Sequence, residues 1–377
     1  MSKELETYVW SLGKCTGCGA CVACCSRGVL FFPEGKQNPD HRKLTKHFGL
    51  STYEIDPCFG CEAFCVEVCP RLREWGDGKM VSVVSARSSL TAIRSRHGDL
   101  LSDVLNQLLV SALKSGFIDG AIITDVDRWT WQPFSRVVTT EEEIYDCAGH
   151  QFIWSPTLSS LNEAVHDKSL RRIALVGAPC VIDAARMIQK SKMKGLEIYG
   201  KSLRILIGRF CAGVCTHNLV SEVIEKEMGI SPRNIAMMDR SAAEKLLTVT
   251  LRDGTVREIS LANTQKYLRM GCARCTDYLA ESSDLSIGYT GSRYGYCTII
   301  TRNAAGESVL TRAVQTGHLE ITKSVDTNQL YIAKRNKQKR RRSQLYDEEL
   351  ILMLEGLTDP EKRLEALKRY AQLSVRR

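Results

Sequence analysis

The hydrophobic pattern of residues 80–320 alternates between two kinds of segment. Short runs rich in β-branched residues are typical of strands, whereas apolar residues spaced three and four apart are typical of helices. Regular alternation of the two predicts an α/β domain. The expected strands are 80–86, 120–124, 172–177 and 203–208, and the expected helices are 100–114, one that begins near Ile182, and 217–228.

A hairpin breaks this alternation near residue 250. Residues 246–251 alternate apolar and polar side chains, the pair Asp253-Gly254 supplies a turn, and the chain then returns. Because a hairpin joins antiparallel strands, we predict a mixed sheet in an α/β (α+β) fold.

The segments on either side of this domain differ in composition. Cysteines are concentrated ahead of a linker expected at 71–79, and after residue 325 a basic tract at 334–342 precedes a predicted helix with Asp359 as its cap. We therefore predict an N-terminal ferredoxin-like module at 1–78, the α/β domain at 79–325, and a basic and helical C-terminal extension at 326–377. No aromatic platform or nucleic-acid motif accompanies the basic tract, so we expect no nucleic acid there, but a solvated arm or a dock for an acidic partner.

The composition narrows the class of protein. The 377 residues are 44 % hydrophobic and 25 % charged, which is ordinary for a globular protein. The longest apolar runs have strand length, far below the roughly 20 residues of a transmembrane helix. We predict no membrane span, and peripheral association stays open. Sixteen cysteines without a recognisable secretion signal indicate a reducing, cytoplasmic location.

Eight cysteines near the N-terminus follow the spacing of an iron–sulfur framework. The first run has intervals of two, two and three residues, and the second has intervals of two, three and three before Pro70. In two-cluster ferredoxins, closely spaced cysteines hold one cubane and the fourth reaches the neighbouring one. The first 4Fe-4S cluster is therefore expected to use Cys15, Cys18, Cys21 and Cys69. The second is expected to use Cys25, Cys58, Cys61 and Cys65.

Other uses of these thiols fit the pattern less well. Zinc closes its shell with four ligands, and it does not require two interleaved runs of four cysteines. A disulfide framework needs an oxidising compartment. Two details stay open: three residues separate Cys61 from Cys65 where the bacterial ferredoxin pattern has two, and Cys24 competes with Cys25 for one corner.

Four further cysteines lie where an α/β domain builds its sites. Cys180 and Cys211 each follow the carboxyl end of an expected strand, and Cys272 and Cys275 form a CxxC pair. We predict that these four thiols hold a third 4Fe-4S cluster. Cys215 is an alternative to Cys211, and a purely structural role as buried thiols is the alternative for Cys180 and Cys211. The cysteines expected to be ordinary thiols are Cys24, Cys147 and Cys297.

Bound clusters would offset part of the chain's positive net charge. The formal net charge is +9. Each cubane carries roughly −2 with its four thiolates, so three would lower the total to about +3. Part of the basic excess is thus expected to neutralise clusters.

A set of motifs occurs in order through residues 10–315. They are Gly116-Phe-Ile-Asp-Gly120, Thr140-Glu-Glu-Glu-Ile144, Ala148-Gly-His-Gln-Phe152, Gly177-Ala-Pro-Cys180, Phe210-Cys-Ala-Gly213, Gly271-Cys-Ala-Arg-Cys-Thr-Asp277 and Ser283-Asp-Leu-Ser-Ile-Gly288. Together they resemble the family of beta subunits of the coenzyme F(420)-reducing hydrogenases and formate dehydrogenases, flavoproteins that exchange hydride with a 5-deazaflavin. With the dicluster module ahead of it, the arrangement is most similar to the input subunit of the archaeal F(420)H(2) dehydrogenase complex.

The resemblance implies FAD beside the third cluster and coenzyme F(420) as the substrate. FAD would split the hydride pair into single electrons, because iron–sulfur clusters accept electrons singly. The implied partners are other redox subunits, of the heterodisulfide reductase, hydrogenase, formate dehydrogenase or membrane dehydrogenase type. The implied flavin contacts are His97, Gly98, Asp99, Gly149, His150, Gln151, Gly177 and Pro179.

The chain departs from the family pattern at two places. The loop into the first helix of the domain has Arg96-His97-Gly98-Asp99 where the family usually has Ser-Gly-Gly, at the point where backbone N–H groups would receive the flavin pyrophosphate. His150-Gln151 replaces the usual Ser-Lys, which removes a cation. The candidates to replace that cation, although a surface position is expected for each, are Lys266, Arg269, Arg274 and Arg293.

Three functional hypotheses remain. The first is a flavin and iron–sulfur oxidoreductase that uses the deazaflavin. The second is a ferredoxin-dependent flavin reductase of another organic substrate, such as a tetrapyrrole. The third is an electron-wiring or docking subunit with a degenerate flavin pocket. Flavin content and the choice of reductant would separate them.

Overall fold

The computed structural model of the chain describes residues 2–48, 51–72, 78–89, 100–147, 152–241 and 245–340, together with Asp359, Glu361, Lys362 and Glu365. At its centre lies an eight-stranded sheet in the order β15-β5-β14-β13-β9-β8-β6-β7. The four inner strands β13, β9, β8 and β6 run parallel, and the remaining pairings are antiparallel. The mixed α/β fold is thus confirmed. The strands are β5 (Ser82–Ser88), β6 (Gly120–Val126), β7 (Pro133–Val138), β8 (Ile173–Gly177), β9 (Leu203–Arg209), β13 (Leu285–Gly288), β14 (Cys297–Thr301) and β15 (Leu319–Thr322).

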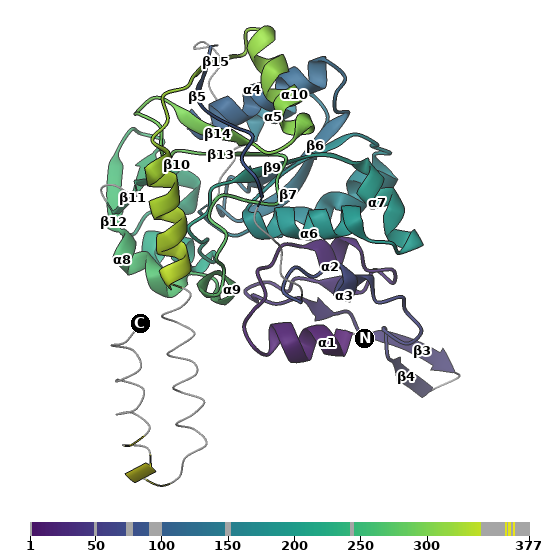
Figure 1. Cartoon of the computed structure of the whole chain (residues 1–377). Helices are drawn as coiled ribbons and strands as arrows, with labels where there is room; N and C mark the ends of the chain where they lie inside the picture. The colour runs from purple at the N-terminus through teal and green to yellow at the C-terminus, as the bar shows by residue number, and fades with distance from the viewer. Residues whose placement is uncertain are drawn as a thin grey trace.

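Helices cover both faces of this sheet (Figure 1). The inner strands are apolar almost throughout, as expected when neither face of a parallel sheet meets water. On one face lie α4 (Leu100–Lys114), α5 (Glu141–Asp146) and α10 (Ala304–Gln315), and on the other lie α6 (Pro179–Lys190) and α7 (Glu197–Ser202). Short helical turns complete this layer: η2 (Thr157–Ser160), η3 (Glu163–Asp167) and η4 (Lys194–Leu196).

A second, smaller sheet packs on the helix η5 (Leu219–Glu227) around its own apolar core. Its strands are β10 (Ile235–Ser241), β11 (Leu246–Leu251) and β12 (Val256–Ser260), all antiparallel. The hairpin predicted from residues 246–251 therefore exists, but it does not belong to the main sheet. The main sheet is mixed for another reason, namely its antiparallel outer strands. The connecting turns are η6 (Pro232–Asn234), α8 (Leu261–Thr264), η7 (Gln265–Tyr267) and α9 (Met270–Ala273).

The N-terminal module lies against α6 (Figure 1). Ala20, Phe64 and Val68 share an apolar core with side chains of α6 such as Ile182. The module and the α/β domain are thus held together by buried apolar surface. The elements of the module are α1 (Ser2–Leu5), η1 (Glu6–Trp10), α2 (Ala20–Ala23), α3 (Phe64–Glu67), β1 (Leu30–Phe31), β2 (Asp40–His41), β3 (Leu44–Phe48) and β4 (Ser51–Ile55).

Two element boundaries differ from those predicted. The helix expected near Ile182 begins at Pro179, because proline has its φ angle preset for the first helical position and needs no hydrogen bond there. Cys180 is therefore in the first turn of α6. The first strand of the domain is also shifted, since β5 starts at Ser82 instead of residue 80.

The basic tract is folded as far as the structure describes it. Residues 327–340 form a helix, the yellow-green one in Figure 1 that leads towards the C-terminus. Leu330 of this helix is fully buried against Leu279 and Ile300. The expectation of a solvated arm is thus wrong for 334–340. Within the described residues, no helix has both the length and the apolar character needed to cross a bilayer.

Candidate metal centres

The first group of predicted ligands surrounds a small cavity in the N-terminal module. Burial raises the pKa of Cys18 to about 12 and that of Cys69 to about 11. Metal ligation requires thiolates, so a bound cluster would have to offset this cost of burial with its own positive metal charge. The residues that line the cavity include Cys15, Cys18, Cys21, Cys69, Leu5, Val9, Trp10, Ala20, Phe32 and Arg71.

The second group lies at the surface side of the module. Burial, together with the neighbouring thiolates of Cys25, Cys58 and Cys61, raises the pKa of Cys65 to about 12. These four thiols therefore share one neighbourhood. Phe59, between the first two cysteines of the second run, is 82 % exposed, so the loop that carries these two cysteines reaches the surface.

The third group is assembled from segments far apart in the sequence. Cys180 lies in the first turn of α6, Cys211 follows β9, and Cys272 and Cys275 lie in and just after α9. Burial raises the pKa of Cys180, and the thiolates of Cys275, Cys18, Cys272 and Cys211 raise it further. The structure thus brings the four predicted thiols together at the carboxyl ends of β8 and β9.

The two cysteines considered as alternatives have other surroundings. Cys24 packs in the apolar core between the module and α6, near Phe64 and Tyr199, although the thiolates of Cys18 and Cys65 also lie close enough to raise its pKa after burial. Cys215 is buried in the core of the smaller sheet, and its Sγ donates to the carbonyl oxygen of Thr264 at 3.6 Å. Neither environment favours the alternative over Cys25 or Cys211.

The three groups form a row. Burial is the main cause of the raised pKa of Cys21 in the first group, and the nearby thiolate of Cys65 in the second group adds to it. In the third group, the nearby thiolate of Cys18 likewise adds to the effect of burial on the pKa of Cys180. Loops of the first and third groups touch, because a Cβ atom added to Gly271 would lie 2.2 Å from the carbonyl oxygen of Cys15. Only glycine permits this approach.

A half-buried cation, Arg71, and a buried one, Lys337, lie beside the third group, and no pattern in the sequence indicated either of them. The Arg71 guanidinium donates to the carbonyl oxygen of Gly271 at 3.4 Å. Burial disfavours its charge, but the thiolates of Cys275 and Cys180 raise its pKa. Lys337 is buried, which disfavours its charge, but the thiolates of Cys275 and Cys211 raise its pKa. Arg71 is the first residue of the linker expected at 71–79, of which residues 73–77 lie outside the described part of the chain.

Arg269 is another buried cation, and its expected surface position is wrong. Its side chain is fully buried, and Nη2 donates to the carbonyl oxygens of Cys15 and Gln37. Burial lowers its pKa, although the thiolates of Cys15 and Cys272 oppose that change. The other candidate cations differ from it, since Lys266 and Arg293 are exposed and Arg274 is half-buried.

The residues around these groups fit anionic clusters. Near the first and third groups, four buried guanidinium nitrogens have no acceptor among the described residues: Nε of Arg71, Nε and Nη1 of Arg269, and Nε of Arg340. A buried donor without an acceptor is costly, and thiolate-held cubanes would supply acceptors and negative charge there. Within the described residues, no three His, Cys, Asp or Glu side chains are grouped around a single-ion position, whereas a cubane holds its ligands farther apart at its corners.

Most of the predicted flavin contacts, namely His97, Gly98, Asp99, Gly149, His150 and Gln151, lie outside the described residues. Gly177 and Pro179 are described, and both are buried. A Cβ atom at Gly177 would lie 2.5 Å from Cγ1 of Val181, so close packing of α6 on β8 already requires a glycine there. Pro179 opens α6.

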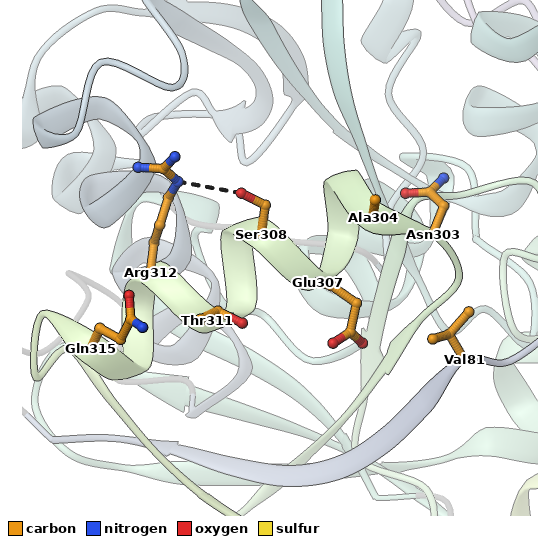
Figure 2. A pocket seen from close by; sticks show the side chains of 8 residues that line it. All are labelled: Val81, Asn303, Ala304, Glu307, Ser308, Thr311, Arg312 and Gln315. Atoms are coloured by element: carbon orange, nitrogen blue, oxygen red, sulfur yellow. Dashed lines mark hydrogen bonds between the residues drawn. The ribbon is translucent and has the colours of Figure 1, made fainter.

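A larger hollow, of about 680 Å³, lies away from these groups. It is open to solvent along α10, where Nε of Arg312 donates to Oγ of Ser308 at 3.4 Å (Figure 2). None of its lining residues was predicted to be functional, and no cysteine is among them. The residues that line it are Val81, Asn303, Ala304, Glu307, Ser308, Thr311, Arg312 and Gln315.

Comparison with known proteins agrees with this geometry. Residues 14–71 match the 4Fe-4S dicluster domain, and residues 83–162 and 170–327 match the N-terminal and C-terminal parts of the coenzyme F420 hydrogenase/dehydrogenase beta subunit. The chain is 31 % identical to the beta subunit of coenzyme F420 hydrogenase of Methanosarcina barkeri over 66 % of its own length and 84 % of that protein. The chain belongs to this family of beta subunits.

Two further proteins similar to the chain are components of redox complexes. The chain is 27 % identical to a subunit of the F(420)H(2) dehydrogenase of Methanosarcina mazei, over 78 % of this chain and 80 % of that protein. A chain of the F420-reducing NiFe hydrogenase complex from Methanosarcina barkeri superposes with a TM-score of 0.65 at 27 % identity, covering 75 % of this chain and 97 % of that one. The predicted family, the oxidoreductase class and the iron–sulfur domain are confirmed.

Proposed function

We propose that the chain exchanges hydride between reduced coenzyme F(420) and FAD and passes single electrons along three 4Fe-4S clusters, to or from a partner redox protein. The observation that carries the proposal is the row of cysteine groups. The second group adjoins the first through Cys65 and Cys21, and the first adjoins the third through Cys18 and Cys180. Twelve thiols in this order provide positions for a continuous series of one-electron carriers.

The third group supports a flavin site in the α/β domain. It lies at the carboxyl ends of β8 and β9, the edge at which open α/β sheets bind their cofactors. FAD bound there would accept a hydride and release the two electrons one at a time. The chain's own part is to hold the third cluster beside that edge and to shield it from water, which the burial of Cys272 supports.

The second group supports an electron exit at the surface. Phe59 projects into solvent between Cys58 and Cys61, and Gly60 beside it is also exposed. We propose this loop as the contact with the partner, a redox subunit of a larger complex. The related proteins support this role, because their names identify them as subunits of a hydrogenase or dehydrogenase.

The test uses anaerobically purified full-length protein. We expect about twelve iron atoms per chain and one FAD, with a flavin absorption band that is bleached by reduced coenzyme F(420) and not by NADH. Iron at that level without flavin would overturn hydride exchange and favour a wiring subunit. Flavin that reduced ferredoxin bleaches but reduced coenzyme F(420) does not would favour a reductase of another substrate, the candidate suggested by the altered residues His97 and His150.

A further inference from the structure

The helix at residues 327–340 brings one positive charge into the third group. The side chain of Lys337 is only 4 % exposed. Its Nζ donates to the carbonyl oxygens of Cys211 and Asp277, each at 2.6 Å. Cys211 is a predicted cluster ligand, and Asp277 lies two residues after the predicted ligand Cys275. A single ammonium group thus joins the two loops that carry these ligands.

The rest of the helix fixes Lys337 in this position. Lys334, Lys337 and Arg340 are three residues apart and therefore share one face. Lys334 pairs with Glu281 at 2.5 Å, and Nη2 of Arg340 donates to the carbonyl oxygen of Ala212 at 2.7 Å. With Leu330 fully buried at its other end, the helix is held at four points along its length.

We propose that Lys337 is a positioning residue whose fixed positive charge favours the reduced state of the third cluster and so raises its midpoint potential. This inference rests on the proposed third cluster. On reduction that cluster gains one electron; no bond forms or breaks and no proton moves, so the thiolate-held unit becomes more negative by one charge. A nearby ammonium group in a dry site interacts more strongly with the more negative state.

Burial distinguishes the proposed role of Lys337 from a general effect of the positive charges in the tract. Lys339 lies on the same helix two residues later, but its side chain is exposed. Water and salt screen an exposed charge, whereas a buried charge is screened much less. Loss of Lys339 is therefore a matched control, since it changes the net charge by the same amount.

The experiment is an anaerobic redox titration of the full chain, followed by electron paramagnetic resonance, with iron and flavin contents measured in parallel. For Lys337→Gln we expect the equilibrium constant for reduction of the third cluster to fall about tenfold, which is about 59 mV for a one-electron couple. Lys339→Gln should leave the potential unchanged. Lys337→Arg, which keeps the charge, should stay close to the unmodified chain.

Each outcome of the titration supports or overturns the proposed role of Lys337. A Lys337→Gln protein with full iron and an unshifted potential overturns the inference. If Lys337→Gln instead loses the third cluster, retention of that cluster with its normal potential in Lys337→Arg supports a role for the charge, and loss in both variants overturns it. An unmodified chain with about eight iron atoms would refute the proposed third cluster itself, which is a distinguishable failure.

Discussion

The guanidinium of Arg269 lies over the indole ring of Trp154, with its Cζ atom 4.0 Å from the ring centroid. The same indole donates from Nε1 to the carbonyl oxygen of Gly17 at 2.9 Å. Gly17 is between two predicted ligands of the first cluster, whereas Trp154 and Arg269 belong to the α/β domain. The pair therefore attaches the first cluster loop to the domain that carries the third group.

We expect Trp154→Leu to loosen this attachment. The substitution removes the cation–π contact and the hydrogen bond to Gly17, which together are worth about 1–3 kcal/mol of local stability. Amide hydrogen exchange in residues 14–21 should become faster, while exchange in the strands of the main sheet stays the same. Trp129→Leu is the matched control, because that indole is 71 % exposed. Equal exchange in 14–21 for both variants would show that the stacked pair does not hold the loop.

Cys24 and Cys25 provide a direct test of the second cluster. Cys25 is grouped with Cys65, Cys58 and Cys61, whereas Cys24, although close to Cys18 and Cys65, is buried in the apolar core against α6. Cys25→Ala should therefore lose about four iron atoms per chain, and Cys24→Ala should keep its iron. Iron analysis with the resonance spectrum of the reduced protein measures both. Loss of iron in Cys24→Ala but not in Cys25→Ala would instead make Cys24 the cluster ligand.

Cys272→Ala tests the third group in the same manner. We expect loss of about four iron atoms with unchanged FAD content, because the flavin is proposed to bind beside the cluster and not to it. Flavin reduced by coenzyme F(420) should then fail to pass electrons to the first two clusters. Cys215→Ala is the control, since Cys215 lies in the core of the smaller sheet. Iron that is unchanged in Cys272→Ala would rule out a cluster on this thiol.

These sites differ in how much of them the sequence could predict. The N-terminal cysteines were recognisable because a cubane is held by ligands at short, regular spacing, so the pattern is local. The sequence also indicated that Cys180 and Cys211 come near each other, since each follows a buried apolar strand and the two strands lie side by side in the sheet. The first prediction needed only local spacing, whereas the second also needed the rule that parallel strands of one sheet end at the same edge.

The sequence could not predict the positions of the buried cations Lys337 and Arg269. Lys337 was one of several basic residues in a charged tract, and nothing local distinguishes it from the exposed Lys339. Its burial depends on Leu330 docking the helix onto Leu279 and Ile300, which is a contact between distant segments. Arg269 was likewise expected at the surface, because the indole it covers lies 115 positions earlier in the chain. Long-range packing overrides the usual preference of such residues for water.

Asp284 shows that a family motif can be structural. It lies in Ser283-Asp-Leu-Ser-Ile-Gly288, one of the motifs that indicated the family. The carboxylate is buried and accepts hydrogen bonds from Nη2 of Arg186 at 2.7 Å, Nδ2 of Asn303 at 2.6 Å and the backbone N–H of Leu206 at 2.7 Å. It thus connects α6, β9 and the start of α10, so we expect its loss to affect stability before chemistry.

We expect Asp284→Ala to lower the free energy of unfolding by about 3–5 kcal/mol, because removal of one partner from a buried ion pair leaves the others unpaired in a dry site. A lower midpoint in anaerobic urea unfolding, with the same slope, would measure this loss. Glu197→Ala is the control: its ion pair with Lys201 is exposed on α7, where water and salt screen the charges, so its loss should change stability little. An Asp284→Ala protein as stable as this control, but unable to bind flavin, would instead place Asp284 in the cofactor site.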